Sequence, residues 1–117
     1  MSHNKICGLL GISRKAGKVI AGTELVAEAI RSKKSTVRLV LLSSDASDNT
    51  AKKVRNCCSH YSKELFVLQI NGETLAHAIG KTGVISACAV CDEGLAKALL
   101  NLLSMNDESE EQREENG

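Results

Sequence analysis

The stretch that decides the fold is Val37-Arg38-Leu39-Val40-Leu41-Leu42, in which five of six consecutive residues are apolar. A nearly continuous apolar run of this length predicts a strand that is buried on both faces at the centre of a sheet. Both faces of such a strand must be covered, so we expect helices on either side of it. Two flanking segments have apolar residues at helical spacing, one at Leu25, Val26, Ala29 and Ile30 and the other at Val54, Cys57, Cys58 and Tyr61.

The remaining elements are separated by glycine and by capping residues, because the chain contains no proline. Helix and strand alternate along the chain, which predicts an α/β fold. We expect a three-layer α/β/α sandwich with a four-stranded mixed sheet, in a single domain over residues 1–105. The other expected elements are a helix over 4–15 that Gly17 ends, a strand over 18–21, a helix that Thr23 caps, a strand over 66–70, a short helix that Asn71-Gly72 opens, a strand over 84–90 and a last helix that Asp92 caps.

Charge is distributed unevenly along the chain, although the formal net charge is only +1. Residues 1–63 contain twelve Lys or Arg residues and four acids, a net charge of +8, whereas residues 107–117 contain six acids and one base, a net charge of −5. A basic half and an acidic tail are typical of nucleic-acid-binding proteins, and a solvated charged surface would also produce them. We expect the tail, residues 106–117, to be disordered because it is charged and has no apolar side chain.

Cysteine spacing raises the alternative of a zinc or redox site, through Cys57-Cys58 and Cys88-Ala-Val-Cys91. Cys-x-x-Cys is the spacing of half a zinc site. Here it falls in a predicted strand, where residues three apart point to opposite faces, and the Cys57-Cys58 pair lies on the apolar stripe of its helix. The chain also shows no glycine-rich phosphate loop after a strand and no Ser-His-Asp or Cys-His arrangement. We therefore expect no metal, no cofactor and no enzymatic activity.

Nothing in the sequence indicates a membrane or an export signal. No stretch approaches the roughly 20 apolar residues of a membrane helix, and the short apolar run near the N-terminus is broken by Gly8 and Gly11. Five cysteines without a signal peptide are typical of reduced intracellular thiols. We expect a cytoplasmic protein with no membrane partner and no small-molecule substrate.

The strongest functional signal is Arg14-Lys15-Ala16-Gly17-Lys18-Val19-Ile20-Ala21-Gly22-Thr23-Glu24. Gly22 has no Cβ, so a ligand backbone can approach closely, and the first amides of the following helix are free donors at the positive end of its dipole. Lys15 and Lys18 stand beside them and can neutralise phosphates. The alternative is that these residues form an ordinary helix start, preceded by a basic segment that is merely solvated.

The run from Gly11 to Val26, GISRKAGKVIAGTELV, resembles the N-terminal signature of bacterial YlxQ-like proteins, which belong to the kink-turn-binding ribosomal-protein superfamily of the "L seven Ae" type. The resemblance continues through Leu39–Thr50 and Leu75–Gly80 and ends in the helix that begins near Asp92. It therefore covers nearly the whole chain except the acidic tail. It implies an α/β/α sandwich that binds kink-turns, which are sharply bent RNA elements with tandem sheared G·A pairs.

The resemblance also implies two recognition regions. One is the start of the second helix, which enters the widened groove at the G·A pairs, and the other is the loop before the last strand, where Val84 and Ile85 would pack on a flipped-out base. The RNA-binding residues that this implies are Lys15, Lys18, Gly22, Thr23 and Glu24 in the first region and Lys81, Thr82, Gly83 and Val84 in the second.

Three residues depart from the family pattern Gly-x-Asn-Glu-x-x-Lys. Glu24 replaces the Asn, Leu25 replaces the Glu and Glu28 replaces the Lys. A carboxylate accepts hydrogen bonds but cannot donate them, and Glu28 would repel nearby phosphates. Since Tyr61 and Phe66 are the only aromatic residues, we expect RNA shape and phosphates to dominate over base sequence.

The sequence leaves three hypotheses. The first is non-catalytic binding of structured RNA, with ribosomal RNA as a candidate and a kink-turn or similarly bent element as the target. The second is a protein-interaction module on the same fold that has lost the standard kink-turn readout. The third is the zinc or redox protein that the cysteines suggest.

Overall fold

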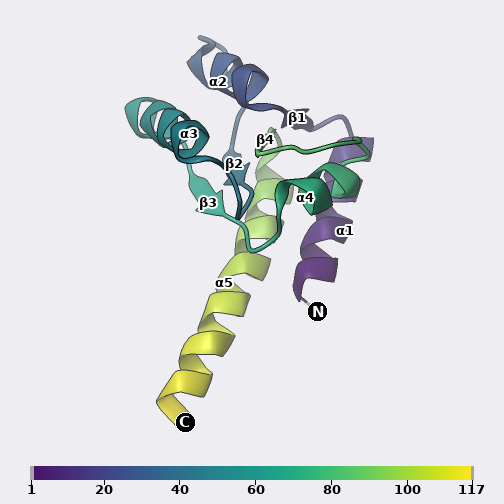
Figure 1. The fold of residues 1–117 in the computed structure, drawn as a ribbon, viewed down its shortest axis with the longest axis vertical. Helices are drawn as coiled ribbons and strands as arrows, with labels where there is room; N and C mark the ends of the chain where they lie inside the picture. The colour runs from purple at the N-terminus through teal and green to yellow at the C-terminus, as the bar shows by residue number, and fades with distance from the viewer. Residues whose placement is uncertain (1, 117) are drawn as a thin grey trace.

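A computed structural model describes the backbone of residues 2–116 and the side chains of residues 4–104. Within these residues five helices alternate with four strands, as the sequence predicted (Figure 1). The backbone continues as helix as far as Asn116, which differs from the disorder expected of residues 106–117. The side chains from residue 105 onward are outside the described part of the chain, and the division into a domain and a tail stays a prediction. The helices are α1 (Ser2–Lys15), α2 (Thr23–Arg31), α3 (Asp48–His60), α4 (Gly72–Ala78) and α5 (Glu93–Asn116), and the strands are β1 (Val19–Ala21), β2 (Leu39–Leu42), β3 (Leu65–Val67) and β4 (Ala87–Val90).

The four strands form one mixed sheet in the order β1-β4-β2-β3. Strand β4 runs antiparallel to both β1 and β2, whereas β2 runs parallel to β3. Strand β2 is therefore internal, and β1 and β3 form the two edges. All four residues of β2 are buried, which confirms the central strand predicted from the apolar run.

Alternate residues of β2 face two separate hydrophobic clusters. Leu39 and Leu41 pack with residues of α1, α4 and α5, whereas Val40 and Leu42 pack with residues of α2 and α3. Figure 1 shows the same division, with α2 and α3 on one side of the sheet and the other three helices on the opposite side. The predicted three-layer α/β/α sandwich is confirmed. None of the helices in the described part of the chain is long and apolar enough to cross a membrane.

The strands are shorter than the apolar runs that predicted them. The clearest case follows β3, where the predicted strand over 66–70 stops at Val67. Leu68 and Ile70 lie beyond the end of β3 but remain 2% and 6% exposed, because they still pack into the cluster with α1, α4 and α5. A run of apolar residues indicates that the residues are buried, but it does not show whether they lie in a strand or in a buried loop.

Two predicted helix features are wrong. The N-cap of α2 is Gly22, with no side-chain cap hydrogen bond, and Thr23 is already the first helical residue. Leu25 and Tyr61 were placed on buried faces but are 56% and 40% exposed, because Ala27 completes the buried face of α2 and Tyr61 lies beyond the end of α3. The predicted caps at the last two helices are confirmed, since Asn71 Oδ1 accepts from Thr74 N (2.8 Å) and Asp92 Oδ2 accepts from Leu95 N (2.9 Å).

Three helices end in the same backbone motif, and a lysine follows each of them. A residue with positive φ comes just after each helix, with φ of 74° at Gly17, 55° at Ser62 and 71° at Gly80. The next amide reaches back to the helix, from Lys18 N to Ser13 O (3.0 Å), from Lys63 N to Cys58 O (2.8 Å) and from Lys81 N to Ala76 O (2.8 Å). These are the hydrogen bonds of Schellman motifs, which confirms that Gly17 ends the first helix. The motif fixes the direction in which each lysine leaves its helix.

Ser62 is the only non-glycine residue with positive φ in the described chain, so we predict that Ser62→Gly stabilises the protein. The left-handed conformation strains any residue with a Cβ, and relief of that strain outweighs the extra entropy of glycine in the unfolded chain. We expect the free energy of unfolding to rise by about 0.5–1 kcal/mol in urea denaturation. Ser62→Ala keeps the Cβ and is the control; an equal gain in both variants would contradict the explanation.

Candidate nucleic-acid interface

One edge of β1 is free, and it faces a groove of about 550 Å³. Gly22 N donates to Ala87 O (2.9 Å) and Lys18 O accepts from Cys91 N (2.8 Å), so these two residues turn their backbone toward β4. Backbone groups alternate in direction along a strand. The N–H and C=O groups of the strand residues Val19 and Ala21 therefore face the free edge.

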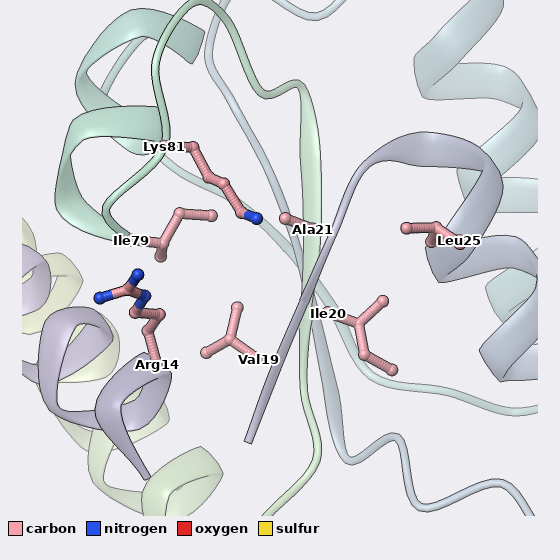
Figure 2. A pocket seen from close by; sticks show the side chains of 7 residues that line it. All are labelled: Arg14, Val19, Ile20, Ala21, Leu25, Ile79 and Lys81. Atoms are coloured by element: carbon pink, nitrogen blue, oxygen red, sulfur yellow. The ribbon is translucent and has the colours of Figure 1, made fainter. Parts of the chain in front are cut away.

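The groove combines an apolar surface with two cations. Figure 2 shows Lys81 extending across the groove toward Ala21, while the Arg14 guanidinium lies on the α1 side beside Ile79. Such a surface suits a ligand that carries anionic groups next to a flat or apolar part. The lining residues come from the end of α1, from β1, from the first turn of α2 and from the end of α4, and they are Arg14, Val19, Ile20, Ala21, Leu25, Ile79 and Lys81.

Arg14 lies against the turn that follows α4 because the residue there is a glycine. A Cβ at Gly80 would lie 2.9 Å from Arg14 Cζ, closer than a real contact allows. Gly80 also has a φ of 71°, which favours glycine on its own account. The Schellman turn after α4 and the position of the Arg14 guanidinium thus depend on the same residue.

The loop between α4 and β4 is attached to the start of α4. Ile85 N donates to Gly72 O (3.0 Å), and a Cβ at Gly72 would lie 2.5 Å from Val84 Cγ1. Gly72 N in turn donates to Asp45 Oδ1 (2.8 Å), which holds the pKa of Asp45 below its usual value. Ile85 is partly buried against the core, whereas Val84 is 64% exposed, so Val84 offers the larger surface to a base. The expectation that these two residues cover a base stays a prediction.

The nine residues expected to bind RNA come from the end of α1, the two ends of β1, the first turn of α2 and the loop after α4, and only one of them is a lining residue of this groove. Lys81 lines the groove itself. Lys18 immediately precedes β1 and Gly22 immediately follows it, so both adjoin the strand that forms the groove's floor. The others are Lys15 at the end of α1, Thr23 and Glu24 in the first turn of α2, and Thr82, Gly83 and Val84 in the loop after Lys81.

Glu24 and Leu25 have separate surroundings although they are neighbours in α2. Glu24 forms an ion pair with Lys53 of α3 and is not a lining residue of the groove. The hydrogen bond and the positive charge of Lys53 hold the pKa of Glu24 below its usual value. Leu25 lines the groove instead. The sequence did contain a signal that Leu25 is exposed, because Val26 and Ile30 are spaced to form the buried stripe of α2 without Leu25.

The cysteines pack as small hydrophobic side chains. Cys88 belongs to the cluster with α1, α4 and α5, whereas Cys91 packs against the cluster with α2 and α3, so they lie on opposite faces of the sheet as expected. Burial raises the pKa of Cys58 to about 11 and that of Cys88 to about 12, which keeps both thiols protonated at neutral pH. Within the described residues, no three His, Cys, Asp or Glu side chains gather as a metal site.

Known proteins resemble this chain over most of its length. The model of the ribosomal protein L7Ae/L30e/S12e/Gadd45 family matches residues 4–100. A Bacillus subtilis (strain 168) protein named RNA-binding protein YlxQ is 40% identical over 95 residues, which are 81% of this chain and 91% of the relative. An Enterococcus faecium protein of the same name is 34% identical over 102 residues, 87% of this chain and 94% of the relative.

The fold is also similar to a solved structure, that of a protein with unknown function from Bacillus halodurans C. The two share a TM-score of 0.77 and 33% sequence identity, over 86% of this chain and 97% of the other. The two relatives and this structure each cover more than four fifths of the chain. The chain therefore belongs to the ribosomal protein L7Ae/L30e/S12e/Gadd45 family.

Proposed function

We propose that this protein binds structured RNA without catalysing a reaction, and that the groove beside β1 is the binding site. The observation that carries the proposal is the pairing of an apolar strand edge with the cations Arg14 and Lys81, in a chain whose relatives are named RNA-binding proteins. Anions attract such cations regardless of sequence, while the apolar floor suits a base or ribose.

The start of α2 would hold a phosphate group of the RNA. The first amides of the helix have no partner within the helix, and they follow the strand that forms the groove. Gly22, with a φ of 105°, leaves room for a nucleic-acid backbone to come close to these amides. Thr23, Lys15 and Lys18 would supply further polar contacts at this side of the groove.

The loop after α4 would hold the other side of the RNA. Lys81 provides charge, and Thr82 and Gly83 bring the chain to Val84, which is exposed enough to contact an unstacked base. A kink-turn presents both features at once, a bent backbone and a base outside the stack. We therefore propose a kink-turn or similarly bent element as the ligand, with ribosomal RNA as a candidate source.

The ion pair of Glu24 reduces the main obstacle to this function. A free carboxylate in the first turn of α2 would repel phosphates, but Lys53 compensates its charge. Leu25 adds apolar surface where a polar side chain would read a base edge. Recognition would therefore depend on RNA shape and phosphates more than on base sequence.

We predict that Lys18→Ala and Lys81→Ala each weaken binding of a kink-turn RNA. Each change removes about one phosphate contact, so the slope of log affinity against log salt should become shallower by about 0.7–1. Titrations across a salt series measure the slope. The control is Lys97→Ala on α5, where Lys97 pairs with Glu93, and it should leave the slope unchanged.

Two results of these titrations would count against the proposal. Equal affinity for an unbent duplex would contradict recognition of bent RNA. A lack of affinity for either RNA at low salt would contradict RNA binding altogether.

We predict that Gly80→Ala lowers both RNA affinity and stability. The added methyl group forces a left-handed alanine and displaces the Arg14 guanidinium, so we expect unfolding to become easier by about 1 kcal/mol. Arg14→Ala should lower RNA affinity to a similar degree with little change in stability. Gly8→Ala is the control, because a Cβ at Gly8 would meet no other part of the protein within 4 Å. Full RNA affinity in both Gly80→Ala and Arg14→Ala would contradict a role for Arg14.

A further inference from the structure

The second edge of the sheet, at β3, also has free backbone groups. Glu64 O accepts from Val40 N (2.8 Å), and Leu68 N donates to Leu42 O (2.8 Å), so these residues turn toward β2. By the alternation of a strand, the N–H and C=O groups of Leu65 and Val67 turn to the outside. Strand β3 is thus an open edge with the hydrogen-bonding pattern that another strand would complete.

A groove of about 430 Å³ lies beside this edge. Its apolar part includes Val67, which is 40% exposed although it is a β-branched strand residue. Its polar part includes the hydroxyl of Ser59 and two cations. The lining residues are Arg55, Cys58 and Ser59 of α3, Lys63 of the following turn, and Leu65 and Val67 of β3.

The charge of this groove is positive and uncompensated. Neither Arg55 nor Lys63 takes part in an ion pair among the residues with described side chains, and no carboxylate lines the groove. The Schellman motif after α3 holds the Lys63 backbone in place through its amide, which bonds to Cys58 O. A ligand with carboxylates therefore complements this surface.

We propose that the β3 groove binds an extended acidic segment of a partner protein, which adds as a strand to the open edge. A peptide strand offers both N–H and C=O groups to Leu65 and Val67, and its alternate side chains can meet the Val67 surface and the two cations. The proposal is independent of RNA binding, because β1 and β3 are opposite edges of the sheet and both grooves can be occupied together.

Other occupants fit this surface less well. RNA phosphates accept hydrogen bonds but do not donate them, and the 2′-hydroxyl and base donors of RNA do not repeat at the spacing of the C=O groups along a strand edge. A second copy of this chain, paired edge to edge, would bring the same cations, Arg55 and Lys63, against each other. The acidic residues 107–117 of this chain have no apolar side chain to cover Val67.

The test is selection of displayed random peptides on the full-length protein. We expect enrichment of segments in which acidic and apolar residues alternate. Binding of a synthesised enriched peptide should fall at least tenfold in Lys63→Glu, and it should weaken as salt rises. Failure to enrich such peptides, or equal binding by Lys63→Glu, would overturn the proposal.

Val67→Pro tests the strand geometry itself. The substitution removes an N–H that points away from β2, so it should leave the sheet intact. It should still lower the affinity for the peptide at least tenfold. Val67→Thr keeps both the N–H and the branched shape, and it should bind normally. If Val67→Pro does not fold, hydrogen exchange decides, because a bound strand must protect the Leu65 and Val67 amides.

The rival occupants give distinct results in the same variants. Loss of RNA affinity in Lys63→Glu, without any peptide binding, would assign the surface to RNA and overturn the proposal. Concentration-dependent dimers that Val67→Pro abolishes, again without peptide binding, would assign it to a second copy and would also overturn it.

Discussion

Every layer of this protein packs against the four residues of β2. None of them is more than 1% exposed, and the alternation of the strand sends Leu39 and Leu41 to one cluster and Val40 and Leu42 to the other. A shift of register by one residue would exchange the two sets, so the packing of five helices depends on this strand. Strand β2 pairs with β4 on one side and with β3 on the other, so the free edges of the sheet in the described chain are β1 and β3.

Open sheet edges invite association with other chains, and this protein places cations at both. At each edge, a lysine is positioned by the Schellman motif that ends the preceding helix. Lys81 leaves the end of α4 to line the β1 groove, and Lys63 leaves the end of α3 to line the β3 groove. At each edge the positive charge would repel a second copy of the same edge and attract an anionic partner.

The side chains at the start of α2, beside the β1 groove, differ from those of the family pattern. Glu24 is engaged by Lys53 of α3, and Leu25 occupies the exposed position next to it. The start of α2 therefore offers amides and an apolar surface rather than polar side chains. This composition favours a ligand recognised by shape, and the ion pair with Lys53 compensates the negative charge of Glu24.

Much of the fold was accessible from the sequence because its signals are local. The apolar run at 37–42, glycine after helix α1 and Asp92 before α5 each act within a few residues, and they predicted the element order and the three layers. Strand order is not local: no pattern in residues 19–21 or 65–67 says that these strands are edges, because their neighbours come from distant parts of the chain.

The same distinction holds for the candidate site. The basic approach to the second helix, and the Lys81 loop as a second region, came from the sequence and its family resemblance. Only the tertiary structure decided that Arg14 lies on Gly80, that Glu24 meets Lys53 and that Leu25 is exposed. These three features depend on how whole helices pack on the sheet. The periodicity of a single helix does not show which other helix its residues will meet.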